Sequence, residues 1–163
     1  MDKDKDYTAG ASESAVIKQA IVIKIGDGYY VIDIMKIKEI IKVLRLTPIP
    51  KAPKFIEGVI NLRGVVIPII DMRKRFELAE KKEDTAKARI VIVSIEKKIV
   101  GLIVDEVKEV IKINVKDIKP PPRLLEGVNT NFIFGVCKYH EELLMILKLD
   151  SILTEDEKEL LKK

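Results

Sequence analysis

Residues 55–73 constrain this chain more than any other stretch of its sequence. They read FIEGVINLRGVVIPIIDMR, in which Gly58 and Gly64 each precede a short run rich in β-branched residues. Glycine adopts positive φ at no steric cost, so we expect both glycines to lie at turns and the two runs to form a tight hairpin. Arg63 then lies at the hairpin tip, where a rigid support holds its planar guanidinium. An ordinary polar turn is the alternative interpretation of this tip.

The same stretch resembles the signature of the CheW family, the coupling proteins of bacterial chemotaxis. Further blocks of similarity follow the family's order, so that the resemblance covers roughly residues 18 to 155. It implies two five-stranded, SH3-like β-barrels packed side by side and a scaffold or adaptor without catalytic activity. It also implies two partners, the regulatory domain of the histidine kinase CheA and the cytoplasmic tips of methyl-accepting chemoreceptors. The flanking blocks are residues 30–40, 47–50, 100–105 and 147–150.

The sequence pattern also favours an all-β fold. Many short apolar runs are separated by glycine and proline turns, which is typical of a barrel or sandwich. Only 5% of the residues are aromatic and none is Trp, so the core must consist largely of Ile, Val and Leu. We expect a flexible tail at residues 1–15, one CheW-like domain at 16–153 and a C-terminal helix at 154–163. Within the domain we expect one lobe at about 28–80 and another at about 85–145, with the terminal strands crossing between them.

Individual elements follow from local patterns. A one-turn helix is expected at 35–39, and Asp71 is expected to cap a short helix that ends at Phe76. Thr154 and Glu157 have the spacing of a capping box at the start of the last helix. The predicted strands are residues 16–25, 29–34, 59–62, 65–70, 89–95, 99–110, 132–138 and 143–149.

The residues that match the family's motif are Glu39, Arg63, Gly64, Gly101 and Asp105. The resemblance implies that Arg63 contacts the receptor, and a charge-assisted bond from Glu39 could orient it. The alternative is a surface ion pair that contributes little to stability. Gly64 and Gly101 are expected to permit turns or a close approach of the backbone.

Four apolar residues are candidates for a receptor-binding groove between the lobes, because a helical receptor tip would dock through apolar anchors. The alternative for each is core packing. These candidates are Ile34, Ile37, Val100 and Val104.

Catalytic, metal and cofactor chemistry find little support in the sequence. Cys137 and His140 are the only residues of their types, and no third group is evident that could orient them as a nucleophile and base. One His and one Cys also fall short of a zinc ligand set. We therefore expect no enzyme activity, no catalytic residue, no metal and no cofactor.

Two alternative functions remain open, one from the charge pattern and one from the same fold in another protein. A net charge of +4 and a run of basic residues between 36 and 54 permit a nucleic-acid-binding β-barrel, although no aromatic residues are interleaved with the basic ones. The chain could also be the CheW-like domain of a CheA kinase or of a CheV-type protein. Its initial Met and its lack of kinase and receiver motifs favour a free-standing coupler.

The expected location is the cytoplasm. A single cysteine excludes an internal disulfide, and no secretory signal is evident. No apolar run reaches the roughly 18 residues that span a bilayer. Recruitment to membrane-associated receptor arrays would therefore occur through partners, without direct membrane insertion.

Overall fold

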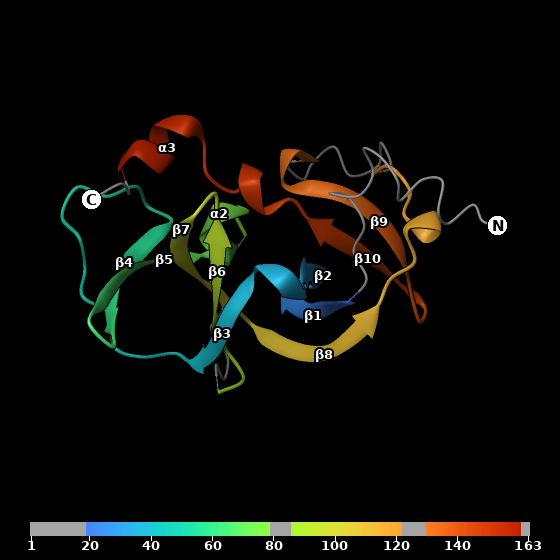
Figure 1. The fold of residues 1–163 in the computed structure, drawn as a ribbon, viewed down its shortest axis with the longest axis horizontal. Helices are drawn as coiled ribbons and strands as arrows, with labels where there is room; N and C mark the ends of the chain where they lie inside the picture. The colour runs from blue at the N-terminus through green and yellow to red at the C-terminus, as the bar shows by residue number, and fades with distance from the viewer. Residues whose placement is uncertain (1–18, 79–85, 122–129, 161–163) are drawn as a thin grey trace.

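The described residues of the computed structural model, 19–78, 86–121 and 130–160, form ten strands in two five-stranded sheets (Figure 1). We call the sheet with strand order β3-β6-β7-β5-β4 the central sheet, and the sheet with order β8-β1-β2-β10-β9 the terminal sheet. The central sheet contains β3 (Ile37–Lys42), β4 (Ile56–Leu62), β5 (Val65–Asp71), β6 (Arg89–Ile95) and β7 (Lys98–Val104). The terminal sheet contains β1 (Gln19–Ile25), β2 (Gly28–Asp33), β8 (Glu106–Lys112), β9 (Ile133–Tyr139) and β10 (Glu142–Leu147).

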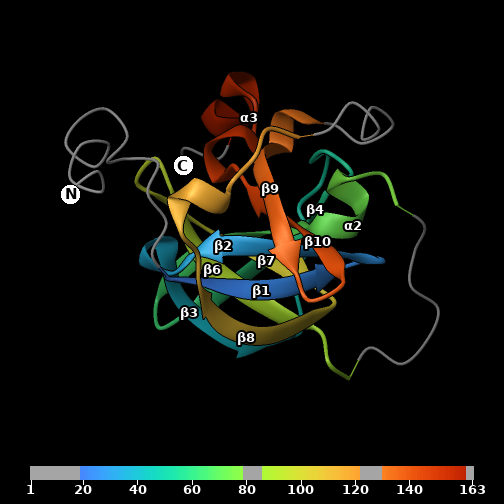
Figure 2. The same ribbon diagram turned by 90° about the vertical axis from the view of Figure 1, so that its right-hand side faces the viewer.

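Short helices lie between the strands and after the last one. Among the described residues, the α-helices are α2 (Met72–Arg75) and α3 (Glu155–Leu160). Figure 1 shows α3 over the central sheet, and Figure 2 views the molecule from the side of the terminal sheet. The 3-10 helices are η2 (Ile34–Lys36), η3 (Val115–Asp117), η5 (Thr130–Phe132) and η6 (Leu149–Ser151).

The predicted lobe boundaries are wrong, although the two-sheet, all-β architecture is confirmed. The expected first lobe, 28–80, combines β2 of the terminal sheet with β3, β4 and β5 of the central sheet. The expected second lobe, 85–145, likewise combines β6 and β7 with β8, β9 and β10. The reason is that β5 pairs parallel with β7, and β10 pairs parallel with β2. Parallel partners are distant in the chain, so local patterns do not reveal them.

The two sheets share one topology. In each sheet an edge strand, β3 or β8, pairs with a hairpin, β6–β7 or β1–β2. That hairpin in turn pairs in parallel with a second hairpin, β4–β5 or β9–β10. The segment after the edge strand then returns to bridge the far edge of its sheet, at Thr47↔Val59 and at Lys119↔Val136. Each sheet therefore curves until its two edge strands face each other across a seam.

The core follows from strands whose two faces are both apolar. In β1, Ala20 and Val22 pack into a cluster within the terminal sheet, while Ile23 packs into a cluster shared by both sheets. In β6, Ile92 belongs to the cluster within the central sheet and Val93 to the shared cluster. Side chains alternate along a strand, so continuous apolar runs can fill two cores at once. The shared cluster is what packs the two sheets against each other.

Most predicted elements appear with modest changes at their ends. The hairpin at 59–70 is confirmed as β4–β5, and Asp71 caps α2 by accepting bonds from the amides of Arg73 and Lys74. The one-turn helix begins one residue earlier, as η2. The expected strand at 99–110 is broken at Asp105, because the chain passes there from the central to the terminal sheet. The tail at 1–15, residues 16–18 of the first predicted strand and residues 161–163 of the last helix lie outside the described residues.

Candidate partner-binding site

The tip of the β4–β5 hairpin is a two-residue turn. Leu62 and Val65 are the last paired residues, and Arg63 (φ 51°) and Gly64 (φ 86°) connect them. Positive φ at both positions is typical of a type I′ turn, which matches the twist of the strands it joins. The side chain of Asn61 supports the turn by accepting a hydrogen bond of 2.9 Å from the amide of Gly64. The tip is therefore a fixed support for the Arg63 side chain.

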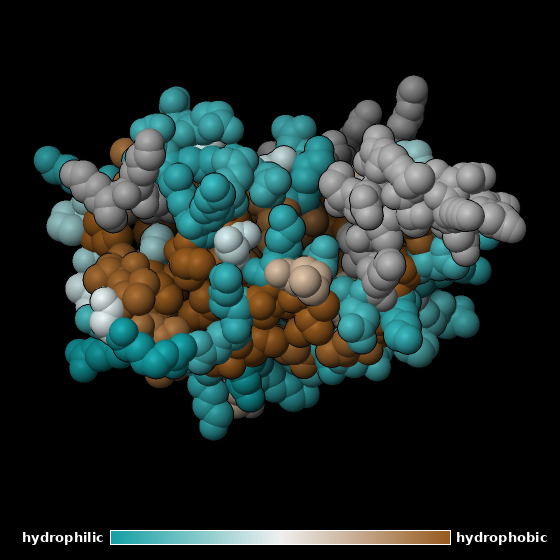
Figure 3. Space-filling model, in the orientation of Figure 1, coloured by the Kyte–Doolittle hydropathy of each residue, from teal (hydrophilic) through white to brown (hydrophobic). Residues whose placement is uncertain are grey.

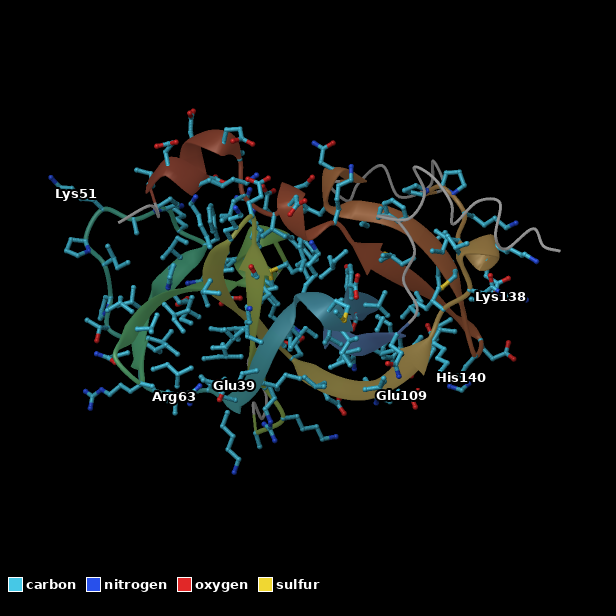
Figure 4. All side chains as sticks on the ribbon, viewed as in Figure 1. Glu39, Lys51, Arg63, Glu109, Lys138 and His140 are labelled. Atoms are coloured by element: carbon cyan, nitrogen blue, oxygen red, sulfur yellow. The ribbon has the colours of Figure 1, made fainter. Side chains whose placement is uncertain are left out.

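Arg63 is paired with Glu39. Nη2 of Arg63 donates a hydrogen bond to Oε1 of Glu39, and Nη1 donates a second one of 3.5 Å to Oε2. Glu39 lies on β3 and Arg63 next to β4, which are opposite edges of the central sheet, so the pair spans its seam (Figure 4). The Arg63 side chain still exposes 69% of its surface. The expected orientation of Arg63 by Glu39 is thus present, and the guanidinium keeps donors free to face a partner.

Exposed apolar side chains lie close to this charged tip in the sequence and in the sheet. Val65 and Val66, which follow the turn, are 53% and 62% exposed, and Val43 and Leu44 after β3 are also exposed. Figure 3 shows apolar surface at this end of the molecule, over β4 and β5. The sequence pattern did not single these residues out, because an apolar run such as 65–70 predicts a strand without showing which of its side chains are exposed. The signal was the run of adjacent apolar residues at 65–67, of which an edge hairpin can bury only every second one.

The proposed groove residues divide into two groups. Val100 and Val104 are buried, at 0% and 1% exposure, within the shared cluster, so the prediction that they line an open groove is wrong. They lie on β7, the middle strand of the central sheet, which is covered by neighbours on both sides. Ile34 and Ile37 are only half-buried and pack on the edge of the same cluster. Of the four residues, only these two keep surface that a partner could reach.

Two of the three glycines expected at turns lie inside strands. Gly58 is within β4 at a register shift, and a Cβ there would come within 2.5 Å of the Thr47 carbonyl oxygen. Gly101 is in the middle of β7, where a Cβ would lie 2.6 Å from the Ile69 side chain. Both are close-approach positions, and Gly64 alone of the three lies at a turn.

Asp105 joins the two sheets. It follows the last residue of β7, and its carboxylate accepts 3.0 Å bonds from Nε of Arg73 as well as a 2.7 Å bond from the amide of Gly26. Arg73 belongs to α2 after the central sheet, and Gly26 to the turn between β1 and β2 of the terminal sheet. The bond to Asp105 raises the pKa of the Arg73 guanidinium. The family-motif residue Asp105 is therefore a connector of the fold.

Cys137 and His140 do not form a nucleophile pair. Cys137 is buried in the apolar cluster of the terminal sheet, and burial raises the pKa of its thiol. His140 lies in the β9–β10 turn with its side chain 76% exposed, 4.0 Å from a carboxylate oxygen of Glu109. Within the described residues no three His, Cys, Asp or Glu side chains gather as a metal site.

Two curved sheets with a shared core, and a charged hairpin tip bordered by exposed valines, define a two-lobed β-protein whose surface suits protein binding. Comparisons with known proteins agree with this class. A family model described as a CheW-like domain matches residues 19–157. The chain belongs to this family.

The relatives named CheW match over most of their length. The chain is 35% identical over 142 residues to the chemotaxis protein CheW of Treponema pallidum, covering 85% of this chain and 84% of the relative. It is 34% identical over 157 residues to CheW of Helicobacter pylori, covering 95% and 94%. The crystal structure of the scaffolding protein TtCheW from Thermoanaerobacter tengcongensis superposes with a TM-score of 0.79 at 38% identity, covering 86% of this chain and 90% of that one.

Proposed function

We propose that this protein is a non-enzymatic adaptor of the chemotaxis machinery, which couples chemoreceptors to the histidine kinase CheA. Its family membership supports a chemotaxis scaffold, since the matching relatives are named chemotaxis protein CheW and scaffolding protein. Every helix in the described part of the chain is too short or too polar to span a bilayer. In this proposal the protein acts in the cytoplasm and reaches the membrane-associated receptor arrays through its partners.

The observation that carries the receptor contact is the Glu39–Arg63 pair at the hairpin tip. A guanidinium that remains 69% exposed while a carboxylate orients it offers fixed donors to a partner's polar groups. Interface hot spots are enriched in Arg and gain strength from an apolar surround that excludes water, which Val65 and Val66 could supply. Ile34 and Ile37 could add apolar contacts to a helical receptor tip.

Reconstitution with purified components tests the proposal. Receptor fragments that carry the cytoplasmic tip are assembled on vesicles and incubated with CheA, with and without this protein. We expect the protein to sediment with the vesicles, to bring CheA with it and to increase kinase autophosphorylation. If the protein binds neither receptor fragment nor CheA, or binds both without joining them in one complex, the proposed coupling is wrong.

A further inference from the structure

The seam of the terminal sheet holds a cavity that the proposed receptor contact does not use. Its volume is about 470 Å³, within the range of ligand sites. The end of β8 and the segment that follows it form one wall, with Ile111 and Ile113, and the edge strand β9 forms the other, with Val136 and Cys137. Leu143 of β10 adds to the apolar lining.

Both ends of this seam are closed. At one end Val136 exchanges two backbone hydrogen bonds of 2.8 Å with Lys119. At the other end the hydroxyl of Tyr139 on β9 donates to the Glu109 carboxylate on β8. Figure 4 places Glu109 and His140 together at this end, with Lys138 farther along β9.

The edge of β9 presents backbone groups toward the cavity. Successive residues of a strand direct their N–H and C=O groups to opposite sides, so Lys138 faces the same side as Val136. Val136 uses that side to bond to Lys119, whereas Cys137 faces β10 through its register with Leu144. Lys138 is therefore the one residue between the two closed ends whose backbone N–H and C=O face the seam, and a short extended peptide could pair with these two groups.

Positive charge surrounds the apolar lining. Lys112, Lys119 and Lys138 all border the cavity, and Asp117 is the one acidic residue among the lining residues that the structure describes. The carboxylate of Glu109, at the closed end, is already engaged by Tyr139. The lysines thus favour a ligand with negative charges, and the apolar walls favour alternating apolar side chains.

We propose that the β8–β9 seam binds a short, extended, acidic peptide segment of a partner protein by strand addition to β9 at Lys138, between the two closed ends. Apolar side chains of the peptide face Ile111, Val136 and Leu143, while its alternate carboxylates face the lysines. This site belongs to the terminal sheet and does not rest on the receptor contact proposed at Arg63.

A synthetic peptide of alternating glutamate and valine, blocked at both ends, is a suitable probe. Titration into the ¹⁵N-labelled full chain should shift the amide resonances of Lys138 and its β9 neighbours. Lys138→Glu should weaken binding by about tenfold or more, because it replaces an attraction with a repulsion. The matched control Lys42→Glu, an exposed lysine on β3 of the central sheet, should leave the affinity unchanged.

Three comparisons can overturn the proposal. A probe N-methylated at its central residues should lose binding, and equal binding would exclude strand addition. Absence of shifts at probe concentrations up to about 1 mM, or shifts confined to the central sheet, would exclude the site. Binding by a variant that lacks residues 1–15 but not by the full chain would identify the chain's own N-terminal segment as the occupant. Arg63→Ala should leave probe binding intact, which separates this test from that of the proposed function.

Discussion

At the residue scale, Arg63 combines a constrained backbone with an exposed side chain. Its φ of 51° lies in the left-handed region, which non-glycine residues rarely adopt. Outliers of this kind gather at functional sites, where the surrounding structure holds them in place. Here the paired strands and the Asn61–Gly64 bond hold the turn, so that the turn does not depend on the Arg63 side chain.

Replacing Arg63 with glycine should separate recognition from folding. Glycine adopts the same φ freely, so we expect Arg63→Gly to keep the turn and the melting temperature. Removal of the guanidinium should weaken binding of a receptor-tip fragment by about tenfold or more, while CheA binding should change much less. Calorimetric titration of both partners, together with thermal unfolding, measures the two effects. An equal loss for both partners, or early unfolding, would show that Arg63 is structural.

Two glycines of the same hairpin should respond differently to alanine. Gly58→Ala should cost roughly 2 to 4 kcal/mol, because the new Cβ meets the backbone of Thr47 and cannot be accommodated by a side-chain shift. Gly64→Ala should cost only about 1 kcal/mol, since a Cβ there meets open space and φ is the only penalty. Urea unfolding of both variants makes the comparison, and equal losses would contradict it.

Tyr139 should show an unusual titration. Burial and the bond to Glu109 raise its pKa to about 12. The folded protein favours the neutral hydroxyl of Tyr139. The contribution of this hydroxyl to the free energy of unfolding is therefore complete below pH 10 and is lost as the pH rises toward 12. The difference between the wild-type and Tyr139→Phe ultraviolet titrations should show a tyrosine that ionises near pH 12. Glu109→Gln should lower that pKa, and an unchanged value would mean that Glu109 has no part in the shift.

At the element scale, helix ends follow from local chemistry while strand partners do not. Thr154 and Glu157 form the predicted capping box, with bonds of 3.1 Å and 2.8 Å between each side chain and the other's amide. Glu157 also accepts a 2.9 Å bond from Arg75, and Lys158 donates to Glu96 on the β6–β7 turn. The capping box was visible in the sequence because it spans three residues, but the docking contacts link residues more than 60 positions apart.

Loss of the Thr154 cap should destabilise the helix end. We expect Thr154→Ala to cost about 1 kcal/mol, because the Glu157 amide loses its side-chain acceptor. Thr47→Ala is a matched control, since Thr47 takes part in the sheet through its backbone N–H and C=O. Chemical denaturation measures both variants, and a loss at Thr154 no larger than at Thr47 would argue against the cap.

At the scale of the whole molecule, the shared cluster and the Asp105 connector unite the two sheets. Val93 and Leu102 from the central sheet pack in the same cluster as Ile23 and Ile32 from the terminal sheet. Each sheet therefore completes its core only with the other in place, and cooperative unfolding is the physical consequence.

Asp105→Ala should lower the stability of both sheets together. Removal of the carboxylate leaves Arg73 and the Gly26 amide without this acceptor, at a cost of about 3 kcal/mol. For a chain of this length that cost corresponds to a fall of roughly 6 to 12 °C in melting temperature. Differential scanning calorimetry should still show one transition. Two separate transitions, in the wild type or the variant, would mean that the sheets unfold independently.

Local sequence patterns were sufficient to predict most of the strands, the hairpin tip and the helix caps, because these depend on residues a few positions apart. Alternating β-branched runs, Gly64 beside Arg63, and Asp71 and Thr154 at helix starts are local signals. Three-dimensional contacts were needed to show that β5 pairs with β7 and β10 with β2, and hence that residues 37–104 form one sheet and the segments on either side of them the other. The same contacts bury Val100 and Val104, give Gly58 and Gly101 their close-packed positions, and leave a lysine-rimmed seam between β8 and β9. Those outcomes depend on contacts between distant residues, whose partners no local pattern specifies.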